Sequence, residues 1–177
     1  MSEPTDARNL LESDDDPIDW GRVLAASDGD VSQAPGTGGP NRHTAWLSTI
    51  EPDGRPHVVA IGTHEVDGAW YFTSSPGARK GKNLARDPRC SISIALDDYD
   101  LVVEGSAQRV TDTATLQRIA HVFSDRGWPA EVRGDAFWAP YNAPTAGPPP
   151  WHLFRLEPAS AYAMAVDEAG GATRWTF

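Results

Sequence analysis

A cluster of basic side chains follows a short aromatic segment near the middle of the chain. Residues 70–73 (Trp-Tyr-Phe-Thr) have the composition of a strand. Residues 74–76 (Ser-Ser-Pro) predict a helix N-terminus, because hydroxyls cap helices and proline suits the first helical turn. Arg79, Lys80 and Lys82 then fall in the opening turns of the predicted helix.

Such a junction can bind an anion. A helix N-terminus presents free N–H groups and the positive end of the helix dipole, and Arg and Lys in the first turns add full charges. A phosphate group suits this arrangement best. The alternative is that these cations form a solvated helix face, which is the commoner role of surface Lys and Arg. The helix is predicted to end at Asp87, because the residue before Pro88 avoids the helical conformation.

Length, charge and composition limit the class of protein. The 177 residues suit one domain with a sizeable core, and 40% of them are hydrophobic. No apolar run approaches the roughly 18–20 residues of a membrane span, so no membrane partner is predicted. The net charge of -10 argues against a general nucleic-acid binder. The polar, acidic start resembles neither a signal nor a transit peptide, and we expect a cytoplasmic protein.

The chemistry of metals and of nucleophilic catalysis is not indicated. Cys90 is the single cysteine, which excludes an internal disulfide and a multi-cysteine zinc site. The five histidines lack metal-ligand spacing, so no metal is predicted. No Gly-x-Ser-x-Gly motif is present, which argues against a serine hydrolase of that type.

The chain divides into an extension and a β-rich domain. Residues 1–40 are acidic and predicted to be partly disordered, with one short helix over residues 17–26 that Asp16 could cap. Residues 41–177 are predicted to form the folded domain. Its first two strands, residues 43–50 and 56–63, flank the turn Glu-Pro-Asp-Gly and so predict a hairpin.

The remaining pattern completes an antiparallel barrel. A helix is predicted over residues 111–123, capped by Asp112 or Thr113, and residues 139–150 form a Pro- and Gly-rich loop. A bulge is expected at Glu104-Gly105. The further predicted strands are residues 69–73, 90–96, 101–110, 151–156, 159–166 and 172–177. The fold class is therefore mainly β (α+β), a barrel of six to eight antiparallel strands with a few peripheral helices.

At this point the sequence resembles a known superfamily over residues 41–177. The segment Ala-Arg-Lys-Gly-Lys-Asn-Leu at residues 78–84, after an aromatic strand that ends in Thr, is similar to its most specific motif. Shorter segments at residues 53–56, 87–89, 103–105 and 151–158 support the match. The superfamily is that of the pyridoxamine 5′-phosphate oxidase-like proteins, the flavin- and deazaflavin-binding split β-barrels.

The resemblance implies a cofactor site and an assembly. It implies that Arg79 and Lys80 bind the cofactor phosphate, and that the backbone of a strand through Val59, Ala60 and Ile61 lies along the ring system. The residues implied to complete this cofactor site are Thr73, Ser74 and Asn83. Members of the superfamily are usually homodimers with two cofactors at the subunit interface, so a homodimer is expected here.

Departures from the superfamily pattern bear on the cofactor. Val59 stands where authentic pyridoxamine phosphate oxidases have an Arg that helps to hold the flavin phosphate, and Asp100 stands near the position of a flavin-contacting Gln. Their substrate-binding Arg-Leu-x-x-Arg type of ending is absent, so vitamin B6 oxidation is not predicted. Residues 39–43, 144–151 and 173–175 instead resemble the branch associated with the deazaflavin coenzyme F-420. F-420 is therefore the predicted cofactor, with FMN as the alternative.

Two functions remain open from the sequence. The first is an oxidoreductase in which reduced F-420 donates a hydride to an unsaturated or carbonyl small molecule, with an FMN-dependent oxidase or reductase of the pyridoxamine phosphate oxidase type as its alternative. The second is a non-catalytic protein that holds a flavin, deazaflavin or haem-related ligand. No catalytic acid or base is nominated. The candidates for a substrate pocket are His57, Trp138, Tyr141 and Trp151.

Overall fold

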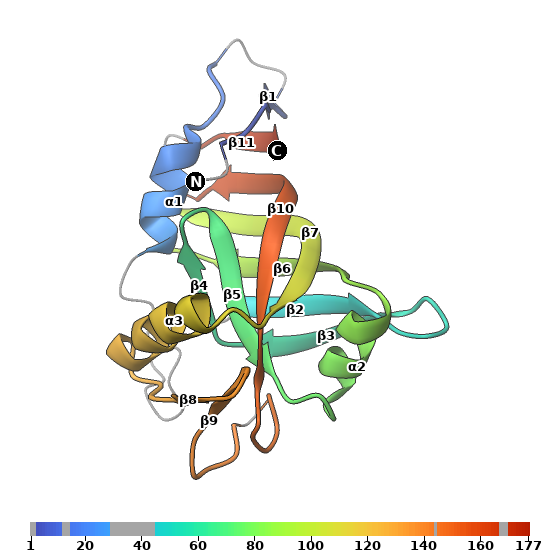
Figure 1. Ribbon diagram of the computed structural model, residues 1–177. Coiled ribbons are helices and arrows are strands. Elements are labelled where there is room, and N and C mark those ends of the chain that lie inside the picture. Colours follow the sequence, from blue (N-terminus) through green and yellow to red (C-terminus); the bar gives the residue numbers. More distant parts are fainter. Residues whose placement is uncertain (1–2, 12–14, 29–44, 144, 167–169) are drawn as a thin grey trace.

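The computed structural model describes residues 3–11, 15–28, 45–143, 145–166 and 170–177, which contain eleven strands and three helices (Figure 1). The helices are α1 (Trp20–Ser27), α2 (Arg79–Arg86) and α3 (Thr113–Asp125). The strands are β1 (Asp6–Asn9), β2 (Ala45–Ile50), β3 (Pro56–Ile61), β4 (Thr63–Val66), β5 (Ala69–Ser74), β6 (Arg89–Ala95), β7 (Tyr99–Val110), β8 (Glu131–Arg133), β9 (Ala136–Trp138), β10 (His152–Ala165) and β11 (Ala172–Thr176).

The main sheet closes into an antiparallel barrel because two successive strands pair with different neighbours. β3 pairs with β2, and β4, which begins just after Gly62, pairs with β5. β5 then pairs with β10, β10 with β7, β7 with β6, and β6 with β2. β3 and β4 are the two ends of this path, and the chain itself joins them. Nine of the described strands belong to this sheet, and β8 and β9 form a separate pair. The mainly β barrel fold predicted from the sequence is confirmed.

The long strand β10 holds the barrel together. One edge of β10 pairs with β7 along nearly its whole length, while the other pairs first with β5 and then with β11. The register with β7 shifts between Pro158 and Ser160, opposite Gly105. A Cβ at Gly105 would lie 2.0 Å from the Glu157 carbonyl oxygen, so only glycine fits there. The predicted irregularity thus lies at the expected place in the sheet, but the extra residue is on β10.

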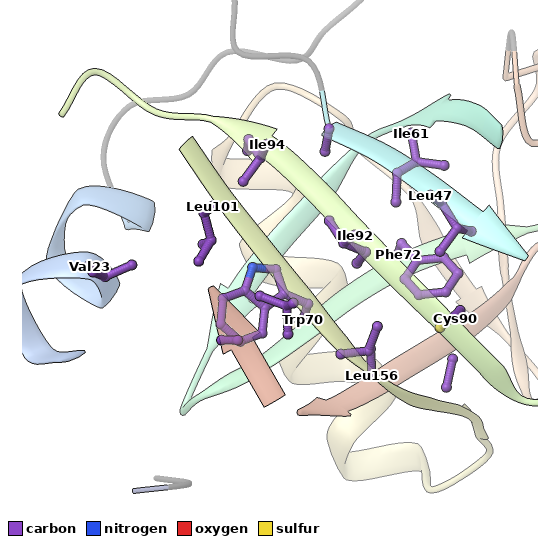
Figure 2. Close-up of a cluster of buried hydrophobic side chains, with 14 of the residues drawn as sticks. Val23, Leu47, Ile61, Trp70, Phe72, Cys90, Ile92, Ile94, Leu101 and Leu156 are labelled. Atoms are coloured by element: carbon purple, nitrogen blue, oxygen red, sulfur yellow. The ribbon is translucent and has the colours of Figure 1, made fainter. Parts of the chain in front are cut away.

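The barrel interior is the larger of two hydrophobic cores. Leu47, Trp70, Phe72, Ile92 and Leu156 point into it from four different strands, β2, β5, β6 and β10 (Figure 2). The second core lies between the outer surface of β5 and β10 and the face of α3. Because successive residues of β5 point into opposite cores, all six residues of this strand are buried. This explains why the aromatic segment shows no alternation of apolar and polar residues.

Helix α3 follows the sequence prediction closely. The Asp112 carboxylate caps it by accepting a hydrogen bond from the Thr115 N–H at 2.8 Å. Leu116, Ile119 and Phe123 fall at helical spacing and are buried against the second core. None of the described helices is long and apolar enough to cross a membrane.

Several predicted elements differ from the structure. The N-terminal extension is predicted to be partly disordered with a single helix, but Asp6–Asn9 forms β1 and pairs with β11. The cap of α1 is Asp19, which accepts from the Arg22 N–H at 3.0 Å, and not Asp16. The two strands predicted over residues 151–166 are one continuous strand, β10. Residues 29–44, which include the end of the predicted extension and the segment 39–43, lie outside the described residues.

Candidate functional site

The basic helix α2 packs tightly against the end of β5. A Cβ at Gly81 would lie 2.4 Å from the Ser75 carbonyl oxygen, so the glycine permits this close approach. The predicted serine cap is wrong, because the N-cap of α2 is Ala78, which makes no side-chain cap hydrogen bond. The Ser75 side chain instead accepts from the Gly77 N–H at 3.2 Å and so forms the turn that precedes the helix.

One face of α2 contacts the hairpin of β2 and β3. Arg79, Asn83 and Arg86 lie four and three residues apart and therefore share this face. The Asn83 side-chain amide donates to Thr49 Oγ1 at 3.1 Å, and both residues are buried. The Arg86 guanidinium donates to the Ile50 carbonyl oxygen. These contacts fix the helix beside the turn that joins the two strands.

Glu51 and His57 lie at the same place. Glu51 Oε1 is 3.5 Å from Arg79 Nε and 3.8 Å from His57 Nδ1. This oxygen is buried, yet it accepts no hydrogen bond from the described residues. The Arg79 side chain is 68% exposed, so its guanidinium can reach a ligand from solvent. We call this group the hairpin-face cluster; its members are Thr49, Glu51, His57, Arg79, Asn83 and Arg86.

Lys80 points to a different side of α2. Its ammonium group is buried and donates to the Thr145 carbonyl oxygen in the Pro- and Gly-rich loop. The Ser75 N–H donates to the Ala146 carbonyl oxygen of the same loop at 2.9 Å. Burial lowers the pKa of Lys80 to about 8. The structure therefore separates the two predicted phosphate ligands, since Arg79 contacts the hairpin and Lys80 contacts the loop.

The two hydroxyl residues predicted at the cofactor site lie at the end of β5. Thr73 pairs with Leu153 of β10, and Ser74 pairs with His152. Both are buried, and the Ser74 hydroxyl donates to the Ser75 carbonyl oxygen at 3.1 Å. The next residue along the chain, Ser75, bonds to the loop that Lys80 contacts.

Strand β3 offers an unpaired edge next to the hairpin-face cluster. Val59, Ala60 and Ile61 pair with β2 on one side, and no other described strand pairs with β3. On the outer face of the two strands, Trp46 is 48% exposed and Val58 is 53% exposed. A flat aromatic ring system could lie along such an edge and bond to its backbone groups. The residues present therefore fit a ligand with a ring system at β3 and an anionic group at Arg79.

The predicted substrate-pocket residues do not gather in one place. His57 belongs to the hairpin-face cluster, whereas Trp151 is fully buried in the second core. The Trp151 indole N–H donates to the Gly147 carbonyl oxygen at 2.9 Å. Tyr141, 40% exposed, lies beside Trp151 with ring centroids 5.9 Å apart. The Trp138 ring is covered by the Arg133 guanidinium at 3.4 Å from its centroid.

A separate cavity of about 440 Å³ lies between the start of α3 and the outer surface of the barrel. Three arginines and the phenol ring of Tyr71 line it. Each guanidinium here is paired with a carboxylate at close range, whereas Arg79 Nε lies 3.5 Å from Glu51 Oε1, so this cavity is a poorer anion site than the hairpin-face cluster. The pairs are Arg109 with Asp135, Arg118 with Asp67, and Arg155 with Glu157.

The sequence reasoning missed Glu51 and Arg86. Arg86 could have been found, because the spacing from Arg79 through Asn83 to Arg86 places all three on one helix face. Glu51 gave no such signal, since its contact with Arg79 joins residues from two elements that are far apart in the sequence.

Fold and site together define the class of protein: a split β-barrel with a basic helix beside an unpaired strand edge. Residues 39–164 match the family model described as pyridoxamine 5′-phosphate oxidase, and the chain belongs to this family. The superfamily resemblance stated from the sequence is thereby confirmed. No curated protein matches the sequence.

Solved structures share this fold at low sequence identity. PhzG from Burkholderia lata 383, in complex with tetrahydrophenazine-1-carboxylic acid, is 15% identical with a TM-score of 0.57, over 89% of this chain and 84% of that one. A pyridoxamine 5′-phosphate oxidase-related, FMN-binding protein from Nostoc punctiforme PCC 73102 is 16% identical with a TM-score of 0.57, over 86% and 87%. General stress protein 26 from Bacillus anthracis str. Sterne is 16% identical with a TM-score of 0.51, over 80% and 93%. At these identities the likeness shows the fold alone.

Proposed function

We propose that this protein is an oxidoreductase that uses reduced coenzyme F-420 to transfer a hydride to an unsaturated or carbonyl small molecule. The observation that carries the proposal is the hairpin-face cluster, where the exposed Arg79 lies next to the unpaired edge of β3. Membership of the pyridoxamine 5′-phosphate oxidase family supports a flavin-type cofactor. The choice of F-420 rests on the sequence segments that resemble the deazaflavin branch.

The residues of this chain would bind and orient the cofactor. Arg79 would hold the phosphate by charge-assisted hydrogen bonds, and Asn83, fixed by Thr49, would keep the helix at the right distance from β3. The backbone of Val59, Ala60 and Ile61 would lie along the ring system. When bound, F-420 supplies the hydride, and the protein supplies orientation and exclusion of water.

Lys80 could bind the cofactor phosphate only after a change in its present contacts. Its ammonium group donates to the Thr145 carbonyl oxygen in the structure, and it would have to leave that acceptor to reach a phosphate. We propose that the Pro- and Gly-rich loop moves when the cofactor binds. Thr73 and Ser74, which directly precede the residue that bonds to this loop, stay candidates for contacts with the cofactor.

The apolar outer face of β2 and β3 supports a homodimer with its two cofactor sites at the interface. Trp46 and Val58 are about half exposed on that face, and exposed apolar patches commonly mark interfaces. Because the face adjoins the edge of β3, a second copy would cover the ring of the cofactor. We propose the cytoplasm as the location of the protein.

The test is equilibrium binding of F-420, FMN and riboflavin to the purified protein, measured by fluorescence quenching. We expect micromolar binding of F-420, weaker binding of FMN, and much weaker binding of riboflavin, which lacks the phosphate. Arg79→Ala combined with Lys80→Ala should weaken F-420 binding by about 1.5–3 kcal/mol for each charge-assisted hydrogen bond that the two substitutions remove. Unchanged affinity in this double variant would contradict the site.

Turnover separates an enzyme from a carrier. Reduced F-420 bound to the protein should be oxidised faster than free F-420 when quinones, enones or tetrapyrroles are added. An equal rate with and without the protein would favour the non-catalytic alternative. Tighter binding of FMN than of F-420 would move the proposal to FMN-dependent chemistry.

A further inference from the structure

We propose that Glu51 is a specificity residue that selects a cofactor with a singly charged phosphodiester over one with a doubly charged phosphomonoester. This inference rests on the proposed function, because it concerns the same cofactor site. It assigns a role to a carboxylate that lies among the cations of the hairpin-face cluster.

The position of the Glu51 carboxylate is the first part of the argument. Oε1 lies 3.5 Å from Arg79 Nε, and the side chain is only 19% exposed. The turn holds this residue in place, since the Glu51 N–H donates to the Arg55 carbonyl oxygen at 2.8 Å and the Gly54 N–H donates to the Glu51 carbonyl oxygen at 2.9 Å. An anion that binds Arg79 must therefore come close to a fixed negative charge.

The charges around Glu51 do not cancel this effect fully. Arg86, on the same helix face, donates to the Ile50 carbonyl oxygen, and Lys80 is directed to the loop. The imidazole of His57 is 3.8 Å from Glu51 Oε1, beyond hydrogen-bond distance. Arg79 and Arg86 are both exposed, but Arg86 already donates to a backbone carbonyl oxygen, so Arg79 is the cation placed to meet a ligand, and Glu51 already shares it.

The phosphate groups of FMN and F-420 differ in charge, and this difference would allow Glu51 to discriminate between the two cofactors. The phosphate of FMN is a monoester, which carries close to two charges at neutral pH because its second pKa is near 6. The phosphate of F-420 is a diester with a single charge at that position. Coulomb repulsion by Glu51 is proportional to the charge of the phosphate group held at Arg79, so the phosphate of FMN is penalised about twice as much as that of F-420. A fixed like charge that disfavours the wrong ligand is a common source of specificity.

The experiment measures the dissociation constants of F-420, FMN and riboflavin for the wild-type protein and for Glu51→Gln. Removing the carboxylate should tighten binding by about threefold for each unit of charge on the phosphate group, which is a modest interaction through a partly solvated site. F-420 should then gain about threefold, FMN about tenfold, and riboflavin nothing. The ratio of the FMN and F-420 constants is the decisive number.

Asp53→Asn is the matched control. Asp53 lies two residues away in the same turn and pairs with Arg55 at 2.7 Å. The substitution removes the same unit of charge from the chain, but the Asp53 side chain is 52% exposed and screened by solvent, so each dissociation constant should change by less than about twofold. Glu51→Met, which has a similar side-chain length, replaces Glu51→Gln if that variant does not fold.

The outcomes distinguish this inference from the function on which it rests. If wild-type protein binds F-420 but Glu51→Gln leaves the FMN to F-420 ratio unchanged, the role of Glu51 is overturned and the proposed function stands. An equal shift in Asp53→Asn would also overturn it, because the effect would then come from net charge. If wild-type protein binds neither cofactor, both the function and the inference are wrong.

Discussion

Helices α1 and α2 lie on opposite sides of the barrel and are held in opposite ways (Figure 1). Trp20 of α1 is buried against the rings of Trp70, Trp175 and Phe177, with centroids 6.1, 5.0 and 5.2 Å away. Helix α2 contacts its neighbours mainly through polar side chains, among them the buried pair Asn83 and Thr49. Helix α1 is thus held mainly by apolar burial, whereas α2 is held by hydrogen bonds and charges together with the buried side chain of Leu84.

The difference separates stability from function. Burial of large aromatic rings contributes strongly to folding and needs no partner from outside. Buried polar groups that lack good partners, such as Glu51 Oε1, lower the stability of the fold. A role in binding a ligand would explain why such a group is present. We therefore expect changes at α1 to act on the free energy of unfolding alone, and changes at α2 to act on ligand binding and on the pH dependence of the free energy of unfolding.

The largest effect is expected at α1. Trp20→Ala should lower the free energy of unfolding by about 3–5 kcal/mol, because it removes a buried ring and leaves a cavity. Urea denaturation of the purified variant measures this loss. A loss below about 1 kcal/mol would mean that the packing of Trp20 against the barrel contributes little to the stability of the fold.

Trp20→Phe is the matched control for that experiment. The indole N–H of Trp20 is buried and has no acceptor among the described residues. Phenylalanine keeps an aromatic ring and removes this unpaired donor, so it should cost much less, about 1 kcal/mol. A loss as large as that of Trp20→Ala would mean that the shape of the indole, and not apolar burial as such, holds α1 in place.

The next effect concerns Lys80 and has a defined sign with pH. Burial lowers the pKa of Lys80 from 10.5 to about 8, so between these values the unfolded chain binds more protons than the folded one. The free energy of unfolding should therefore rise with pH through this window, by up to about 3 kcal/mol. Lys80→Met should lack that rise. Urea denaturation at about pH 7, 8.5 and 10 measures it as a difference between wild type and variant.

The exposed neighbour Lys82 provides the control for Lys80. Lys82→Met removes the same charge from the same helix, but this side chain lies at the surface. Its pH profile should run parallel to that of the wild type. If Lys80→Met also ran parallel, then the ammonium group would be solvated in solution and the contact with the Thr145 carbonyl oxygen would not persist.

The fold could be predicted well because its signals are local. The hairpin of β2 and β3 follows from the turn at residues 51–54, and α3 follows from Asp112 and the spacing of its apolar residues. The continuity of β10 could not be predicted, because Pro158 interrupts the strand pattern and a bulge opposite Gly105 accommodates it. Nor could β1, whose polar sequence becomes a strand only by pairing with β11.

The sequence predicted which residues of α2 belong to the candidate site, but not the directions in which their side chains point. The residues of α2 could be recognised from their types and from the family resemblance, but adjacent helical residues point about 100° apart. That rotation sends Arg79 to the hairpin and Lys80 to the loop. Which side chain meets Glu51 depends on how α2 packs against β2, and this is decided by Gly81 and Asn83 together.

The smallest effect compares the N-termini of the same two helices. Asp19 caps α1, whereas Ala78 leaves the first N–H groups of α2 without a side-chain acceptor at the cap position. Asp19→Ala should therefore lower the free energy of unfolding by about 1 kcal/mol, and Ala78→Ser should raise it by about 0.5–1 kcal/mol. Thermal or urea denaturation of both variants measures these changes.

The two cap variants should differ in binding as well. A serine hydroxyl at position 78 would occupy N–H groups that an anion near Arg79 could otherwise use, so Ala78→Ser should weaken F-420 binding by a few fold. Asp19→Ala, on the far side of the barrel, should leave that binding constant unchanged. If Ala78→Ser stabilised the protein and bound F-420 as tightly as wild type, the anion would be held by the Arg79 side chain alone. The missing cap of α2 would then have no part in function.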